Sequence, residues 1–445
     1  MMKRKMTRRN FLKVAAAVSA AGVMSACGGD GMPPASSANG NTGNTGNVGD
    51  TGNSGETPDN GSGGDSGEEE EVIETNWKYR ETDYLVPNGT VEITGYNGTL
   101  EPNVVIPEKI GKYTVTIIGG LDNRDEILSV TIPANVKKIS NSAFSECHSL
   151  KQIYFSEGLE AIWDDAFYKC TSLQSIDLPS SVNHLGQRIF NGCEKIKTVS
   201  IPSNVHGLYG TFQGSGITEI VIPDTVEEIT SETFLGCKDL VKVELQGNPK
   251  WGDNEFAQCS SLELIELPDD MEKINKGMFC DCNALKNFKF PSKLKYIGDS
   301  AFMRVAFAEV KLPESVVRID DYAFYGSESI KNVTLPQTLT YIGKAAFEGT
   351  GITKVVLPER LTDIAEKMFL ECRKLESIYI PKAVQTIGKE AFKDCSLRDV
   401  YYVGTGQGRL TNGFIFLYKP IHAASFFLLP YVTLRNSPQL TGNLV

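Results

Sequence analysis

A phenylalanine returns every 22 or 23 residues through most of this 445-residue chain. The periodic positions are Phe144, Phe167, Phe190, Phe212, Phe234, Phe256, Phe279, Phe302, Phe324, Phe347, Phe369 and Phe392. Self-similarity at such a period is typical of a solenoid, in which each turn of chain is one structural unit. Solenoids present extended surfaces for binding rather than enclosed catalytic pockets. We therefore expect the phenylalanines to be structural residues that form a buried column.

The unit 375–395 shows how one turn is built. Ile378 and Ile380 alternate with polar residues, a period of two that predicts a short strand with one buried face. Pro381 ends this strand because it has no N–H to donate. A second apolar pair follows, and Phe392 then lies in a short helical or turn segment. One such unit buries too little apolar surface to fold alone, so we expect the units to stack.

The repeated phrase L-x-x-I-x-L-P-x-x-V-x-x-I-G-x-x-A-F-x-x-C resembles the BspA-like leucine-rich repeats of bacterial surface proteins. The resemblance covers roughly residues 88 to 404. It implies a leucine-rich repeat solenoid, a right-handed, strand-rich superhelix with short helical turns and about 12–13 repeats of 22–23 residues. In studied members it implies adhesion to host or microbial surfaces. It implies no catalytic residues.

The first 27 residues predict an export signal rather than part of the fold. Thr7–Lys13 matches the twin-arginine pattern, and Met24–Cys27 resembles a lipobox with Cys27 as the lipid-modified residue. The alternative is an ordinary cleaved signal with an accidental cysteine. We expect an exported lipoprotein, anchored to the membrane at the bacterial cell envelope or surface.

Composition divides the rest of the chain. Residues 28–71 are rich in Gly, Asn, Ser, Thr and acids, which predicts a disordered tether. Residues 72–128 predict an N-terminal cap and atypical repeat, with a hairpin at 89–98 turning at Asn97-Gly98. The repeat array is predicted for 129–404. Residues 405–445 predict either a closing cap or a non-native tail.

Charge limits the possible partners. The formal net charge is −11, and the predicted signal contains six basic and no acidic residues, which leaves −17 after its removal. A chain this acidic is not expected to bind nucleic acid or to dock electrostatically on anionic lipid.

Cysteine positions follow the repeat. Eight of the ten cysteines lie three residues after a repeat phenylalanine, namely Cys147, Cys170, Cys193, Cys237, Cys259, Cys282, Cys372 and Cys395. Other turns place Ser215, Val305, Ser327 or Thr350 in the same small slot, so we expect free, buried thiols there. A disulfide framework is the alternative, although stacked side chains that point in parallel suit the required dihedral angle badly.

No enzyme motif stands out. The chain lacks G-x-S-x-G, a phosphate-binding glycine loop and H-E-x-x-H. Cys280-Asp281-Cys282 is a lone C-x-C, and His184 with His206 lacks a third ligand for zinc. We expect no catalysis, no cofactor and no metal.

The outward strand positions are the candidate ligand surface. Tyrosine, arginine and lysine gather at Lys289, Tyr296, Lys311, Arg318 and Tyr341, and exposed tyrosine and arginine are favoured contact residues. The alternative role of such aromatics is ordinary cross-strand packing.

These features favour a lipid-anchored cell-surface binding protein, an adhesin that engages protein or glycan partners through its repeat surface. We expect the protein to be a monomer, held to the membrane by the lipid on Cys27. A membrane-proximal envelope scaffold is the alternative, and an enzyme that acts on envelope glycans comes third.

Overall fold

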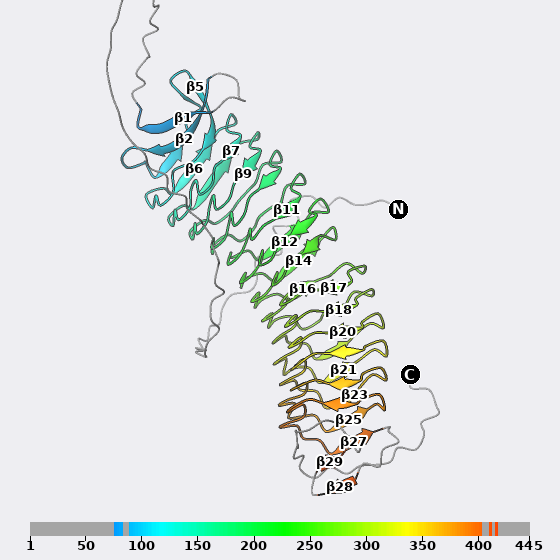
Figure 1. The fold of residues 1–445 in the computed structure, drawn as a ribbon. Coiled ribbons are helices and arrows are strands. Elements are labelled where there is room, and N and C mark those ends of the chain that lie inside the picture. Colours follow the sequence, from blue (N-terminus) through cyan, green and yellow to red (C-terminus); the bar gives the residue numbers. More distant parts are fainter. Residues whose placement is uncertain (1–74, 83–88, 403–408, 412–413, 417–445) are drawn as a thin grey trace, which may run out of the picture. The chain divides into compact units, whose positions relative to one another are not determined.

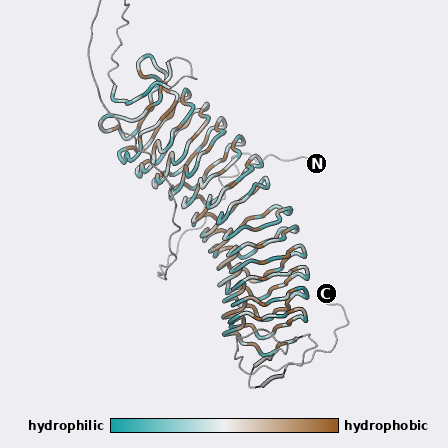
Figure 2. The backbone as a smooth tube through the Cα atoms, viewed as in Figure 1, coloured by the Kyte–Doolittle hydropathy of each residue, from teal (hydrophilic) through white to brown (hydrophobic). Residues whose placement is uncertain are grey.

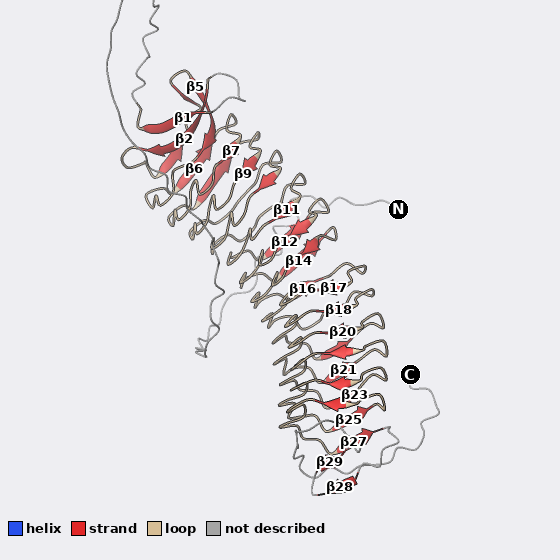
Figure 3. Ribbon diagram, viewed as in Figure 1, coloured by secondary structure: helices blue, strands red, loops and turns tan. Residues whose placement is uncertain are grey.

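The computed structural model describes residues 75–82, 89–402, 409–411 and 414–416, all within the compact unit Glu71–Val445. They form a parallel β-solenoid of about 14 turns with repeats of about 23 residues, which confirms the predicted fold. The turns stack in chain order (Figure 1). Strands and loops make up the described part, which contains no helix (Figure 3). Each phenylalanine segment is therefore a turn, one of the two conformations expected.

One side of the stack, the long-strand side, carries the strands that end near the repeat proline. They pair in parallel with the equivalent strands of neighbouring turns, in three separate runs. These strands are β3 (Asn103–Val105), β6 (Ser129–Ile132), β8 (Gln152–Phe155), β12 (Glu219–Ile222), β14 (Lys242–Leu245), β16 (Leu264–Ile265), β19 (Glu309–Lys311), β21 (Asn332–Thr334), β23 (Lys354–Val356), β25 (Ser377–Ile380) and β27 (Asp399–Tyr402).

A second side, the short-strand side, carries mostly two-residue strands that follow the proline turn. They also pair in parallel with neighbouring turns, in four separate runs. These strands are β5 (Tyr113–Ile118), β7 (Lys138–Ile139), β9 (Ala161–Ile162), β10 (His184–Leu185), β11 (Gly207–Leu208), β13 (Glu228–Ile229), β15 (Lys250–Trp251), β17 (Lys273–Ile274), β18 (Tyr296–Ile297), β20 (Arg318–Ile319), β22 (Tyr341–Ile342), β24 (Asp363–Ile364) and β26 (Thr386–Ile387).

The third side consists of the turns that contain the phenylalanines. Here an N–H in one turn donates to a carbonyl in the next, as the N–H of Phe144 does to the carbonyl of Ala166 at 2.8 Å. The residues two before and two after each of the twelve phenylalanines are left-handed, with φ between 53° and 73°. Only seven of these 24 residues are glycine. The stacked hydrogen bonds therefore hold many ordinary residues in a conformation that costs about 1–2 kcal/mol each.

The phenylalanine rings form one continuous column in the core. Successive rings stack with centroids 5.3–5.9 Å apart and planes within 4–19° of parallel. All twelve are buried, and Leu121 extends the column in the turn before Phe144. Apolar and polar residues alternate along each turn (Figure 2). Each of these twelve turns thus contributes one ring to a core that no single turn encloses.

The N-terminal end differs from the prediction. β2 (Thr90–Tyr96) is one unbroken strand, so the hairpin predicted for 89–98 is wrong. Its antiparallel partner is β1 (Trp77–Glu81), which lies earlier in the chain, and its parallel partner is β5. β4 (Lys109–Ile110) forms a tight antiparallel pair with β5. Asn97-Gly98 follows the end of β2 and does not connect two strands of a hairpin. Its turn propensity is the same in both situations, so the sequence alone did not distinguish them.

Several predicted segments lie outside the described residues. These are the signal 1–27 with Cys27, the tether 28–71 and most of 405–445. Within the last, β28 (Arg409–Thr411) pairs antiparallel with β29 (Phe414–Phe416). Among the described residues, no helix has the length and apolar character needed to cross a membrane.

Candidate binding surface

Parallel register places outward side chains of successive turns side by side. On the short-strand side the first residue of a strand points outward and the second points into the core. Tyr296 is 41% exposed, for example, whereas Ile297 is fully buried. Register pairs Tyr296 with Arg318 and Arg318 with Tyr341. Three of the five predicted ligand-binding residues therefore form one row on β18, β20 and β22.

Two contacts hold the central arginine of this row. The guanidinium carbon of Arg318 lies 3.9 Å from the centroid of the Tyr341 ring, a cation–π contact. Its Nε donates to Oδ1 of Asp320 at 2.5 Å, and this carboxylate raises the pKa of Arg318. The row thus presents a positioned guanidinium, paired with Asp320, between two exposed tyrosines.

The two predicted lysines lie elsewhere. Lys311 is an outward residue of β19 on the long-strand side. Lys289 lies in the irregular stretch between β16 and β19, and its Nζ is 3.5 Å from Oδ1 of Asp269. The five predicted residues therefore form two groups. The outward residues of the long strand and of the short strand are close in sequence, but they lie on different sides of each turn.

A second candidate site lies at a turn that is one residue short. In eleven of the twelve phenylalanine turns, the inward residue of the short strand lies five positions before the ring, as Ile229 does before Phe234. Leu208 lies only four positions before Phe212. Beside the short segment Tyr209–Thr211 is an open cavity of about 340 Å³ lined mostly by polar residues, which we call the short-turn pocket. Sequence analysis missed it, although the Leu208–Phe212 spacing was a visible signal.

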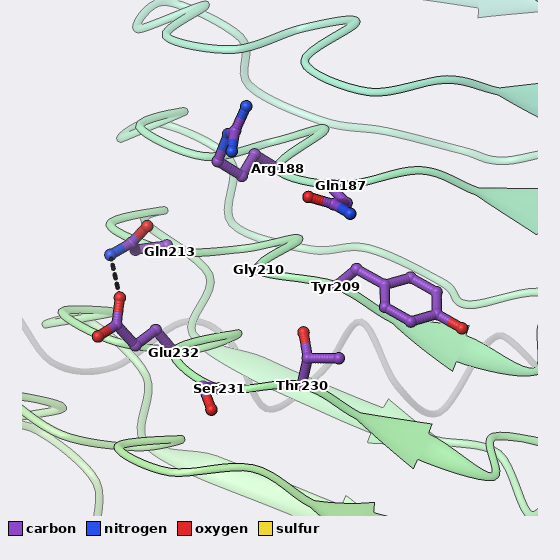
Figure 4. A pocket seen from close by; sticks show the side chains of 8 residues that line it. All are labelled: Gln187, Arg188, Tyr209, Gly210, Gln213, Thr230, Ser231 and Glu232. Carbon is purple, nitrogen blue, oxygen red and sulfur yellow. Dashed lines mark hydrogen bonds between the residues drawn. The ribbon is translucent and has the colours of Figure 1, made fainter. Parts of the chain in front are cut away.

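Three consecutive turns line the short-turn pocket (Figure 4). The lining residues are Gln187, Arg188, Tyr209, Gly210, Gln213, Thr230, Ser231 and Glu232. Nε2 of Gln213 donates to Oε2 of Glu232 at 3.4 Å. Arg188 donates from Nε and Nη2 to the two carboxylate oxygens of Asp165, at 2.9 and 2.6 Å. Its charge is therefore balanced by a neighbour outside the pocket.

Comparison with protein-family models shows which family this chain belongs to. The family described as "BspA type Leucine rich repeat region (6 copies)" matches residues 121–211, 209–310 and 295–407, which is more than half of the chain. The chain belongs to the BspA-type leucine-rich repeat family. A second match, to the twin-arginine translocation pathway signal sequence, covers residues 5–25, so this BspA-type chain carries a signal for export. No curated protein matches the chain.

Solved structures resemble the chain over most of the repeat array. A leucine-rich repeat protein from Bacteroides ovatus is 24% identical, with a TM-score of 0.52, covering 74% of this chain and 94% of that one. A leucine rich cell surface protein from Faecalibacterium prausnitzii is 25% identical, with a TM-score of 0.45 and the same coverage. The pneumococcal vaccine antigen PcpA is 19% identical, with a TM-score of 0.48, covering 76% and 88%. The Bacteroides ovatus structure supports the fold of this BspA-type chain.

The predicted cysteine slot has a common geometry in this BspA-type array. Each of the eight ladder thiols donates to a main-chain carbonyl one turn back, at 3.0–3.1 Å. The acceptor is the phenylalanine carbonyl, except that Cys147 donates to Leu121. All nine described cysteines are free thiols. Burial raises the pKa of Cys147 to about 12, which keeps this thiol protonated and unreactive.

The weaker candidates for chemistry separate in space. Sγ of Cys280 lies 3.5 Å from Oδ2 of Asp281, whereas Cys282 is a buried ladder residue. The ring of His184 contacts Trp163, and Nδ1 of His206 lies 3.9 Å from Glu227. Within the described ranges, no three histidine, cysteine or acidic side chains are grouped as metal ligands.

Proposed function

We propose that this BspA-type protein is a lipid-anchored binding protein of the bacterial cell surface, an adhesin that engages protein or glycan partners through its repeat surface. The observation that carries the proposal is the exposed row Tyr296–Arg318–Tyr341, in which register places the three residues side by side and a cation–π contact joins Arg318 to Tyr341. Tyrosine and arginine are the residues that most often dominate interface energies.

The rigidity of the array supports this role. Eleven consecutive ring stacks and the parallel ladders hold the outward residues in place before a partner arrives. A preformed surface loses little conformational entropy on binding, so weak contacts along several turns add to a useful affinity. The binding mode needs no cofactor and no second copy of the chain.

The export signal and the lipobox-like Met24–Cys27 support membrane anchoring. The test is a Cys27→Ser variant, with metabolic labelling by a radioactive fatty acid and fractionation of the cells. We expect the native protein to carry label and sediment with membranes, and the variant to lose both properties. Membrane retention of unlabelled Cys27→Ser would contradict the lipid anchor.

Protease shaving of intact cells, with antibody detection of the repeat array, tests surface exposure. We expect rapid release of the array. The binding row is tested by adhesion of cells that carry Tyr296→Ala, Arg318→Ala and Tyr341→Ala together. The matched control is Thr386→Ala, an exposed residue of the same column on β26. Reduced adhesion by the triple variant alone supports the row, and unchanged adhesion rejects it.

A membrane-proximal scaffold is the second candidate function, and the tether length favours it. If 28–71 is the flexible chain that its composition predicts, its 44 residues would have an r.m.s. span of about 35–40 Å. Such a tether keeps the array close to the membrane wherever the cell wall is thick. Protection from protease until the envelope is opened would favour the scaffold over the adhesin.

A further inference from the structure

Three aromatic residues lie on consecutive turns next to the short-turn pocket. Trp163 follows β9 and is 43% exposed. His184 of the next turn has its ring centroid 5.8 Å from that of Trp163. Tyr209 of the third turn lines the pocket. Trp163 and His184 therefore lie side by side on the short-strand side, and Tyr209 lies one turn further along, at the pocket.

Gly207 fixes the position of the tyrosine. A Cβ on residue 207 would lie 2.3 Å from Oη of Tyr209 and 2.5 Å from its Cζ. The ring therefore lies across the strand surface at a place where only glycine leaves room. Tyr209 is thus held flat beside the pocket instead of extending into solvent.

The stretch from Trp163 to Tyr209 is long enough to contact more than one ring of a bound ligand. Trp163 and Tyr209 are two turns apart, which is roughly 10 Å at the usual spacing of paired strands. A single small molecule in the pocket would not reach Trp163. A linear ligand that contacts both must extend along the stack.

The polar groups of the pocket favour a neutral ligand. Arg188 is paired with Asp165, so it offers little free positive charge to an anion. The carboxylate of Glu232 also lines the pocket, where it repels an anion and can accept a hydrogen bond from a ligand hydroxyl. The side-chain amide of Gln187 and the hydroxyl of Tyr209 have no hydrogen-bond partner among the described residues. Free amide and hydroxyl groups beside exposed ring faces match a molecule that combines many hydroxyls with apolar C–H faces.

We infer that the short-turn pocket and the row Trp163–His184–Tyr209 form a binding site for a neutral oligosaccharide. One sugar unit occupies the pocket, with its hydroxyls on Gln187 and Glu232 and the ring of Tyr209 at its edge (Figure 4). A second unit lies along the aromatic row towards Trp163. The inference rests on the proposed binding function and assigns it a glycan ligand at a site separate from Tyr296–Arg318–Tyr341.

The test is a titration of the purified full-length protein. An array of neutral oligosaccharides selects the tightest ligand, and calorimetry then compares its Kd among variants. We expect Trp163→Ala and Tyr209→Ala to weaken binding at least about tenfold, as loss of a central aromatic contact does. Gly207→Ala should weaken it too, because the new methyl group displaces the Tyr209 ring. The control is Tyr154→Ala, since Tyr154 is 52% exposed on the long-strand side.

Further variants keep the test decisive. If Tyr209→Ala unfolds, the Kd values of Gln187→Ala and Trp163→Ala still test the site. Both side chains are exposed, so their truncation should leave the fold intact. Binding to no neutral oligosaccharide, binding to cationic peptides alone, or equal Kd values for Trp163→Ala, Gln187→Ala and the native protein would overturn the inference. Surface exposure and adhesion through Tyr296–Arg318–Tyr341 would stand after that result, so the two proposals fail separately.

Discussion

The thiol of Cys170 donates a 3.1 Å hydrogen bond to the main-chain carbonyl of Phe144, one turn earlier. Cys193 makes the same contact with Phe167 at 3.1 Å. The slot thus combines a small apolar volume with a donor that satisfies a buried carbonyl. This geometry explains why both cysteine and serine occur there, and why the thiols need no disulfide partner.

We expect thiol titration of the denatured, unreduced protein to find nearly all of the nine cysteines beyond Cys27 free. In the native protein the ladder thiols should react far more slowly, because burial raises the pKa of Cys147 to about 12 and that of Cys372 to about 11. A thiol-reactive dye, with and without denaturant, gives both counts. One free thiol or none in the denatured chain would contradict the ladder.

Serine should replace a ladder cysteine at little cost. The hydroxyl of Ser327 already donates to the carbonyl of Phe302 at 3.0 Å, the same bond that the thiols make. We expect Cys170→Ser to lower the free energy of unfolding by less than about 1.5 kcal/mol. Cys170→Leu should lower it by about 1–3 kcal/mol through overpacking. Denaturant unfolding compares the two variants. Equal losses in the free energy of unfolding would mean that the volume of the slot does not restrict which side chain fits there.

Repetition made the core predictable from sequence. The spacing of the phenylalanines located the buried column, and the residue set at the cysteine position described a small slot. Both features repeat in almost every turn, so one turn explains the others. The repeated motif that resembles the BspA-type repeats predicted the solenoid architecture before any contact between residues was known.

Features that occur once, or that stacking imposes, were not predictable in the same way. The row on β18, β20 and β22 requires knowledge of which columns share a side. The left-handed residues include Arg188 and Lys169, whose side chains give no hint of that conformation. Hydrogen bonds to the next turn impose it. The pairing of β1 with β2 is equally hidden, because nothing in either segment specifies the other.

Removal of one ring should open a cavity in the column. Phe324 stacks between Phe302 and Phe347, with centroids 5.4 and 5.3 Å away. We expect Phe324→Ala to lower the free energy of unfolding by about 3–5 kcal/mol. Phe234→Ala should behave alike. Chemical denaturation measures the loss, with exposed Tyr154→Ala as the control, and a loss below about 1 kcal/mol would place the ring outside the core.

A left-handed glycine gives a test of backbone strain alone. Gly236 has φ of 71°, and a Cβ there would meet nothing within 4 Å. We expect Gly236→Ala to lower stability by about 1–2 kcal/mol through backbone strain, without any clash. Gly236→Asn should cost less, because asparagine tolerates this conformation. Thermal or denaturant unfolding compares the pair. Equal stability of Gly236→Ala and the native protein would show that the stack relaxes at this turn.

Glu255 should make stability depend on pH. Its side chain is fully buried at a position where several turns have alanine, and its two oxygens accept hydrogen bonds from the N–H groups of Gly252 and Thr233. Burial raises the pKa of this carboxyl to about 9. The folded chain therefore keeps a proton that the unfolded chain loses above its ordinary pKa of 4.5.

This difference sets the sign and the pH window. The free energy of unfolding should fall as pH rises from about 5 to about 9, by up to about 1.4 kcal/mol for each pH unit. Glu255→Gln cannot ionise, so its stability should fall less steeply over the same range. Glu228→Gln, a change at an exposed position of β13, is the matched control. Denaturant unfolding at four pH values gives the slopes, and parallel slopes for Glu255→Gln and the native protein would mean that the buried carboxyl is already ionised in the folded state.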